Sequence, residues 1–267
     1  MSDISKILLE KSKKRRTYRQ FLEEPVDIDI IKDCIMTAAT APSGADKQPW
    51  HFSIIIDPVM KEKIREESEK IEKEFYDSKI TKEWREDLNK LTLTWKKPFL
   101  TQAPCLIVIF KEFYKENSDG TLDKNYYVNE SIGISIGFLI NALHNAGYAS
   151  LTYTPAPMMF LRDLLKRPSG ETPVMILVVG KPDPSYSLPL LTKKTFEEIA
   201  EIIGVDSLGY LNTEYVSLLA GGSHCGGFCA ACFDGKYPTE VPKTASKSRF
   251  EQKITDGKKA RENEEHE

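Results

Sequence analysis

The residue types that could do chemistry begin with a basic cluster near the start of the chain. Residues 13–19 read Lys-Lys-Arg-Arg-Thr-Tyr-Arg, which places five cationic side chains within seven residues. Guanidinium groups form bidentate, charge-assisted hydrogen bonds with phosphate, and a threonine hydroxyl adds another donor. Such a run can also be the solvated end of a helix. The phosphate-binding interpretation assigns four residues: Arg15, Arg16, Thr17 and Arg19.

A second candidate is the segment 41–50, Ala-Pro-Ser-Gly-Ala-Asp-Lys-Gln-Pro-Trp. Its two prolines and its glycine prevent a helix or strand from continuing through it. Because the side chains of Ala41, Ser43, Gly44 and Ala45 are small, backbone N–H groups stay uncovered and a flat or anionic ligand could approach closely. The alternative is an ordinary helix-to-strand connection.

The five cysteines suggest neither a disulfide framework nor a complete metal site. Three of them, Cys225, Cys229 and Cys232, are bunched together, and Cys34 and Cys105 fall in segments expected to be buried. Three local thiolates are one short of the four that an iron–sulfur cluster or a structural zinc usually requires. We therefore expect no bound metal.

Apolar periodicity predicts the elements that must position these residues. Helices are expected over 3–14, 28–40, 58–78, 81–97, 126–146, 158–166 and 196–203. Strands are expected over 51–56, 104–110, 149–154 and 174–179. Glu72 and Tyr76 are four residues apart on the third helix, so they share one face. Helices interleaved with a few buried strands indicate an α/β or α+β domain whose sheet is covered on both faces.

Charge and hydropathy exclude two classes of partner. The chain of 267 residues has a net charge of −3, which gives no electrostatic case for nucleic acid. The most apolar helical run, 131–147, contains Asn141, His144 and Asn145 and is too short to span a bilayer. Since residues 1–14 also lack an apolar signal core, a cytoplasmic location is expected.

Taken together, the segments resemble the nitroreductase superfamily, and specifically its iodotyrosine deiodinase branch. The resemblance covers about residues 15–193. It rests on six segments: RRTYR (15–19), TAPSGADKQPW (40–50), EKEFY (72–76), WREDLNKLTLTWKKPFL (84–100), APCLIVIFK (103–111) and NALHNAGYASLTYTP (141–155).

The resemblance implies an α+β fold with a central mixed sheet flanked by helices and a helical lid over about residues 68–100. It also implies FMN as cofactor, bound at two sites in the interface of a homodimer and built by both subunits. The residues that would contact FMN are Arg15, Arg16, Thr17, Arg19, Pro42, Ser43, Thr152, Tyr153, Thr154 and Lys193. Where the family has an arginine, Lys193 keeps the charge and loses the bidentate fork, so its contact with the phosphate is expected to be weaker.

The implied activity is FMN-dependent reductive dehalogenation of halogenated tyrosines, with NAD(P)H or a separate reductase as electron donor. Ala45 would donate its N–H to the substrate phenolate, and the Thr154 hydroxyl would act near flavin N5. Glu72, Tyr76 and Lys97 would close over the substrate, and they supply the acceptor and donors that a zwitterionic amino acid requires. The alternatives are a general FMN-dependent nitroreductase or quinone reductase, and a flavin- or metal-binding regulatory module.

The C-terminal part differs from the rest. Residues 202–211 and 229–242 resemble the extreme C-terminus of glutamine amidophosphoribosyltransferase, but neither an N-terminal cysteine nucleophile nor a phosphoribosyl pyrophosphate loop is found. The predicted organisation is an FMN-binding domain over 1–204, a small appendage over 205–242 and a polar, disordered tail over 243–267.

Overall fold

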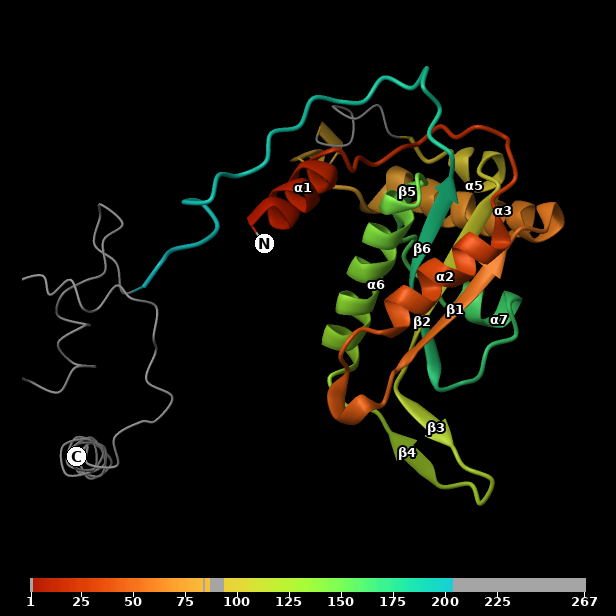
Figure 1. Ribbon diagram of the computed structural model, residues 1–267. Helices are drawn as coiled ribbons and strands as arrows, with labels where there is room; N and C mark the ends of the chain where they lie inside the picture. Colours follow the sequence, from red (N-terminus) through yellow and green to blue (C-terminus); the bar gives the residue numbers. More distant parts are fainter. Residues whose placement is uncertain (1, 84, 87–93, 204–267) are drawn as a thin grey trace, which may run out of the picture. The chain divides into compact units, whose positions relative to one another are not determined.

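A four-stranded sheet forms the centre of the part of the chain that precedes Thr192 (Figure 1). The computed structural model describes residues 2–83, 85–86 and 94–203. The chain divides into two compact units, Met1–Leu191 and Thr192–Glu267. Several predictions lie outside the described residues: those for residues 84 and 87–93 of the lid, the appendage 205–242 with its three cysteines, and the tail 243–267.

The strand order is β1 (Trp50–Ile55), β2 (Cys105–Glu112), β6 (Glu171–Gly180), β5 (Ala149–Tyr153). All pairings between these strands are antiparallel. A parallel pairing enters through an isolated bridge between Thr17 and Ser150 on the edge strand β5. The expected α+β class is confirmed by this sheet and the helices that cover it.

Helices cover both faces of the sheet (Figure 1). On one face, α2 (Ile28–Ala39) and α6 (Val128–Asn145) share a core with alternate residues of β2 and β6. On the other face lie α3 (Pro58–Glu74), α5 (Phe99–Gln102) and α7 (Phe160–Leu164). Strand β2 is therefore buried from Cys105 to Phe110, as its continuous apolar sequence predicts. Each fully buried Ile or Leu contributes roughly 1.5–3 kcal/mol.

Aspartates fix where two of these helices begin. The Asp27 carboxylate accepts hydrogen bonds from the N–H groups of Asp29 and Ile30 at the start of α2. The Asp57 carboxylate does the same for Val59 and Met60 at the start of α3, where Pro58 occupies the first turn. Each such cap stabilises its helix by about 1 kcal/mol.

The predicted lid helices end differently in the structure. Helix α3 ends at Glu74 and continues as the π-helical turn η2 (Phe75–Lys79). The helix expected over 81–97 does not extend through 94–97. Two causes are visible: the Lys97 N–H donates to the Glu69 carboxylate instead of a helical carbonyl, and Pro98 disfavours helical geometry at the residue before it.

Two further segments depart from the sequence-based expectation. Residues 196–203 form no helix; the N–H groups of Ile199 and Ala200 both donate to the Phe196 carbonyl, which closes a single turn. An isolated turn has no packed face to extend it. The hairpin of β3 (Tyr114–Glu116) and β4 (Leu122–Lys124) lies outside the predicted strands. Helix α1 (Ser2–Lys13) completes the elements, and no described helix combines the length and apolarity needed to cross a bilayer.

Candidate active site

The arginine cluster lies against the edge of the sheet. Residues 15–19 follow α1, are all half-buried, and pair with β5 through the Thr17–Ser150 bridge. The Arg16 guanidinium donates to the Pro189 carbonyl, so the segment after β6 runs beside the cluster. Within the described residues, no carboxylate forms an ion pair with Arg15, Arg16 or Arg19. Three half-buried guanidinium groups without an acidic partner fit an anion such as a phosphate.

Thr152 and Tyr153, the last two residues of β5, and Thr154, which follows them, point in alternating directions, as extended backbone requires. Thr152 and Thr154 are exposed, whereas Tyr153 is buried and packs edge-on against Phe99, with ring centroids 5.5 Å apart. The side chain of Tyr153 therefore faces away from the side that Thr152 and Thr154 share. Burial, and then the nearby Glu72 carboxylate, raise the pKa of Tyr153 well above its usual value, so its phenol stays neutral.

The structure brings together the three residues predicted to bind the substrate zwitterion. The Lys97 Nζ lies 3.1 Å from the Glu72 carboxylate. It also lies above two aromatic rings, 5.6 Å from the centroid of Tyr76 and 5.7 Å from that of Tyr153. Glu72 comes from the last turn of α3, Tyr76 from η2, and Lys97 from the segment before α5.

Electrostatics connect this cluster with the arginines. Burial lowers the pKa of Lys97, and Glu72 opposes that effect. The positive charge of Arg19 lowers the same pKa further, which requires Arg19 to lie within electrostatic reach of Lys97. Burial and the Glu72 charge raise the pKa of Tyr76. Of the predicted phosphate-binding residues, Arg19 is therefore near enough to Lys97 to influence its charge.

The segment 41–49 lies at the other end of the sheet. Thr17 bridges to Ser150 of β5, and the strand pairings continue from Ser150 through β6 to Cys105 at the start of β2. Trp50 instead pairs with Lys111, near the end of β2. From Cys105 to Lys111 the strand extends by about 20 Å. Strands β1 and β5 are also opposite edges of the sheet. A single chain therefore does not bring Pro42, Ser43 and Ala45 to the arginines or to Thr154.

This segment, called the 41–49 loop below, has an unusual backbone. Residues Gly44–Asp46 form a 3-10 turn, and Ala45, Asp46 and Gln48 have φ angles of 51°, 52° and 48°. Left-handed backbone costs a residue with a side chain roughly 1–2 kcal/mol. Strain of this kind persists where surrounding contacts fix it and is common at ligand sites. Pro42 and Ala45 are exposed, and Ser43 is half-buried.

Comparisons with known proteins agree with this geometry. The model of the nitroreductase family matches residues 12–181. The chain belongs to the nitroreductase family. Within that family it is similar to iodotyrosine deiodinases: 48% identical over 180 residues to the protein of Haliscomenobacter hydrossis, covering 67% of this chain and 81% of the relative. To the protein of Nematostella vectensis it is 42% identical over 190 residues, covering 70% and 71%.

Solved structures place this nitroreductase-family chain in the same group. A crystal structure of oxidized iodotyrosine deiodinase bound to FMN and 3-iodo-L-tyrosine superposes with a TM-score of 0.63 at 33% identity, covering 70% of this chain and 96% of the other. A BluB-like flavoprotein of Clostridium difficile 630 has a TM-score of 0.59 at 23% identity, which supports the fold alone.

Sequence reasoning missed the residues that support the lid in this family member. The Glu69 carboxylate accepts from the Lys97 N–H at 2.7 Å and from the Arg65 guanidinium at 2.8 Å. Burial alone would raise the pKa of Glu69, but these donors outweigh it and lower the pKa. The i, i+4 spacing of Arg65 and Glu69 was the available signal; nothing local pointed to Lys97.

Lys193 lies in the second unit, Thr192–Glu267. Its contact with the phosphate therefore stays a prediction.

Proposed function

We propose that this chain is an FMN-dependent reductive dehalogenase of halogenated tyrosines. The observation that carries the proposal is the convergence of Glu72, Tyr76 and Lys97. These residues offer one anion, one phenol and one cation, which match the ammonium and carboxylate of an amino acid. The 48% identity with an iodotyrosine deiodinase supports the same substrate class.

The residues present also fit FMN. The guanidinium groups of Arg15, Arg16 and Arg19, which form no ion pair with a carboxylate in the described part of the chain, would hold the phosphate, with the Thr17 hydroxyl beside them. Thr152 and Thr154 present hydroxyls on the exposed side of β5, where they can donate to the flavin ring edge. When bound, FMN would supply the two electrons that the reaction consumes, and its own electrons would come from NAD(P)H or a separate reductase.

In the proposed reaction the carbon–halogen bond is replaced by a carbon–hydrogen bond, halide leaves, and two electrons and one proton are consumed. Glu72 would bind the substrate ammonium, and Lys97 with Tyr76 would bind its carboxylate. The Ala45 N–H would stabilise the phenolate. Closure of the lid would exclude water, which strengthens each of these interactions.

We also infer a homodimer with two shared sites. Its support is the separation within one chain: Pro42, Ser43 and Ala45 lie at the opposite end of the sheet from the arginines, and they precede β1, whereas Thr154 follows β5 at the opposite edge. A second copy can supply the missing half of each site. Exposed apolar residues on α2 and α6, among them Met36, Ile134 and Phe138, offer a surface for it.

The test is anaerobic turnover of 3-iodotyrosine by dithionite-reduced, FMN-loaded protein, with released iodide measured against time. Stoichiometric iodide and tyrosine are expected. Rapid reduction of a quinone or nitroaromatic without iodide release would overturn the proposal in favour of the general nitroreductase function that the family also contains. Equilibrium sedimentation of the same sample tests the dimer.

A further inference from the structure

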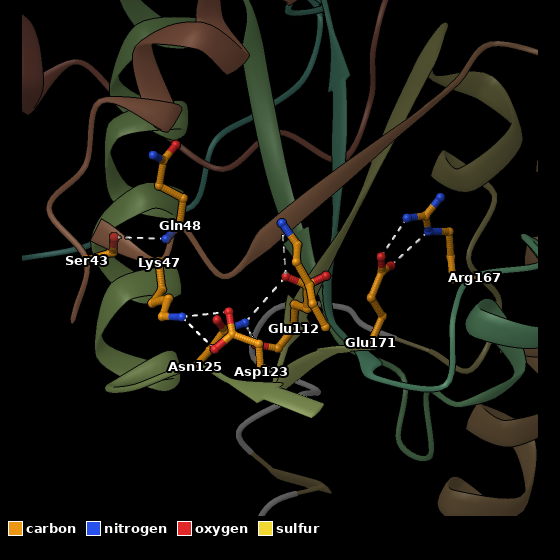
Figure 2. A network of polar contacts seen from close by, with 9 residues as sticks. Ser43, Lys47, Gln48, Glu112, Asp123, Asn125, Arg167 and Glu171 are labelled. Atoms are coloured by element: carbon orange, nitrogen blue, oxygen red, sulfur yellow. Dashed lines mark hydrogen bonds and ion pairs between the residues drawn. The ribbon is translucent and has the colours of Figure 1, made fainter. Parts of the chain in front are cut away.

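We propose that the Lys47–Asp123 ion pair is a clamp by which the β3–β4 hairpin holds the 41–49 loop and so positions the Ala45 N–H. The role given to Ala45 rests on the proposed function. The clamp itself rests on contacts within the chain (Figure 2). Lys47 and Asp123 are positioning residues in this proposal and touch no reacting atom.

The 41–49 loop needs external support. Its left-handed residues Ala45, Asp46 and Gln48 adopt a backbone that residues with side chains disfavour. Its internal hydrogen bonds close it on itself: the Gln48 N–H donates to the Ser43 hydroxyl at 3.0 Å, and the Asp46 N–H donates to the Ser43 carbonyl at 3.1 Å. These bonds stabilise the turn but do not fix its position relative to the rest of the protein.

The end of the loop is anchored where the Glu112 N–H of β2 donates to the Pro49 carbonyl at 3.1 Å. Two further contacts, on either side of Ala45 and Asp46, fix the turn itself. On the first side, Gly44 packs so closely on the chain before α6 that an added Cβ would lie 2.9 Å from the Tyr126 carbonyl oxygen. On the second side, the Lys47 Nζ donates to both carboxylate oxygens of Asp123, each at 2.7 Å. The two residues between these points have little freedom left.

Asp123 is itself held firmly. It lies on β4, opposite Lys115 of β3. At the base of the hairpin, the Asn125 side chain donates to the Glu112 carbonyl at 2.7 Å (Figure 2). The Asn125 N–H donates to the Phe113 carbonyl at 2.9 Å. The hairpin is thereby joined to the end of β2, and Lys47 is joined to the central sheet through it.

The solvent exposure of the Lys47–Asp123 ion pair determines how much its removal should affect stability. The side chains of Lys47 and Asp123 are 28% and 49% exposed. Ion pairs in such surroundings contribute little to global stability. Removing the clamp should therefore loosen the loop while the midpoint of global unfolding hardly changes.

The first test measures the loop directly, by amide hydrogen exchange on full-length, FMN-loaded protein. Exchange at Asp46, Lys47 and Gln48 should become at least tenfold faster in Lys47→Met and in Asp123→Asn. The control is Lys32→Met, which removes another exposed ion pair of similar length, to Asp29 at 2.8 Å. The doubly exchanged variant, Lys47→Asp with Asp123→Lys, should restore slow exchange. Unchanged exchange in both single variants would overturn the clamp.

The second test asks whether the clamp positions the N–H toward a phenolate. The dissociation constants of 3-iodotyrosine and of its O-methyl ether are measured for each variant, because the ether cannot carry the phenolate charge. The preference of the unmodified protein for the free phenol should fall at least threefold in Lys47→Met and persist in Lys47→Arg. Faster exchange with an unaltered preference would overturn the positioning role.

The two tests also separate this inference from the proposed function. If the unmodified protein binds neither ligand, the proposed function fails, and hydrogen exchange still decides on the clamp.

Discussion

The Lys97 ammonium lies 3.1 Å from the Glu72 carboxylate, and these side chains are only 9% and 15% exposed. The pair carries the same two charges that a substrate zwitterion presents. Binding would then exchange one ion pair within the protein for two between protein and ligand, with the ligand ammonium on Glu72 and its carboxylate on Lys97. Affinity should therefore depend on both residues and on the charge of both ligand groups.

Glu72→Gln and Lys97→Met should each weaken binding of 3-iodotyrosine more than tenfold. Removing one partner of a desolvated charge pair costs roughly 2–5 kcal/mol. Isothermal titration against each FMN-loaded variant measures the loss, and reduction of a simple quinone, which has no zwitterion, should stay nearly unchanged. Equal losses with the quinone would point instead to a folding defect.

Arg19→Ala should loosen FMN at least tenfold. The substitution removes one charge-assisted contact with the phosphate, worth on the order of 1.5–3 kcal/mol. Flavin absorbance retained after dialysis gives the measurement. Lys14→Ala is the matched control, because Lys14 belongs to the same basic run but is exposed. If Arg19→Ala retains flavin as well as Lys14→Ala does, the phosphate assignment is wrong.

Thr154→Ala should slow dehalogenation while quinone reduction persists. Its hydroxyl is the expected donor to flavin N5, and Thr152 presents a second hydroxyl on the same exposed side of β5. Iodide release and quinone reduction are compared in Thr154→Ala and Thr152→Ala. If only Thr152→Ala selectively loses iodide release, Thr152 rather than Thr154 is the donor to flavin N5.

Because of His51, the free energy of unfolding should decrease as the pH is lowered from 6.5. Burial, and then the Arg167 charge, lower the pKa of His51 in the folded protein, with Glu171 acting against them. The unfolded chain therefore binds more protons than the folded one as the pH falls from 6.5 toward the folded pKa. The contribution of His51 to the free energy of unfolding is fully present above pH 6.5. It is lost below that pH, by at most about 1.4 kcal/mol per pH unit.

Urea unfolding at several values between pH 5 and 8 measures this slope. His51→Gln should flatten it. An equally steep slope in that variant would assign the acid sensitivity to other groups.

Truncation after Gly204 should leave FMN content, dimerisation and iodotyrosine turnover within about threefold of the full chain, a difference below ~1 kcal/mol. The reason is that all the proposed site residues precede this point. Size-exclusion chromatography, flavin absorbance and iodide release give the three measurements. Loss of flavin on truncation would show that the C-terminal part belongs to the site.

Much of the local structure was determined by the sequence itself. The helix starts predicted at residues 28 and 58 are confirmed, and the structure caps each with the aspartate before it, Asp27 or Asp57. The continuous apolar run at the start of β2 indicated a strand buried on both faces, which it is. The shared face of Glu72 and Tyr76 followed from their spacing of four residues. Each of these inferences depends on neighbours within one turn or one strand, where backbone geometry is regular.

Tertiary structure alone decided how the site is assembled. Lys97 leaves the expected helix because Glu69, twenty-eight positions earlier, accepts its N–H. Tyr153 turns toward Phe99 because strand alternation gives it the covered face of β5. Lys47 meets Asp123, seventy-six positions away, only because the hairpin folds back beside the 41–49 loop. Contacts between distant segments depend on how the sheet orders its strands, and no spacing within the sequence encodes that order.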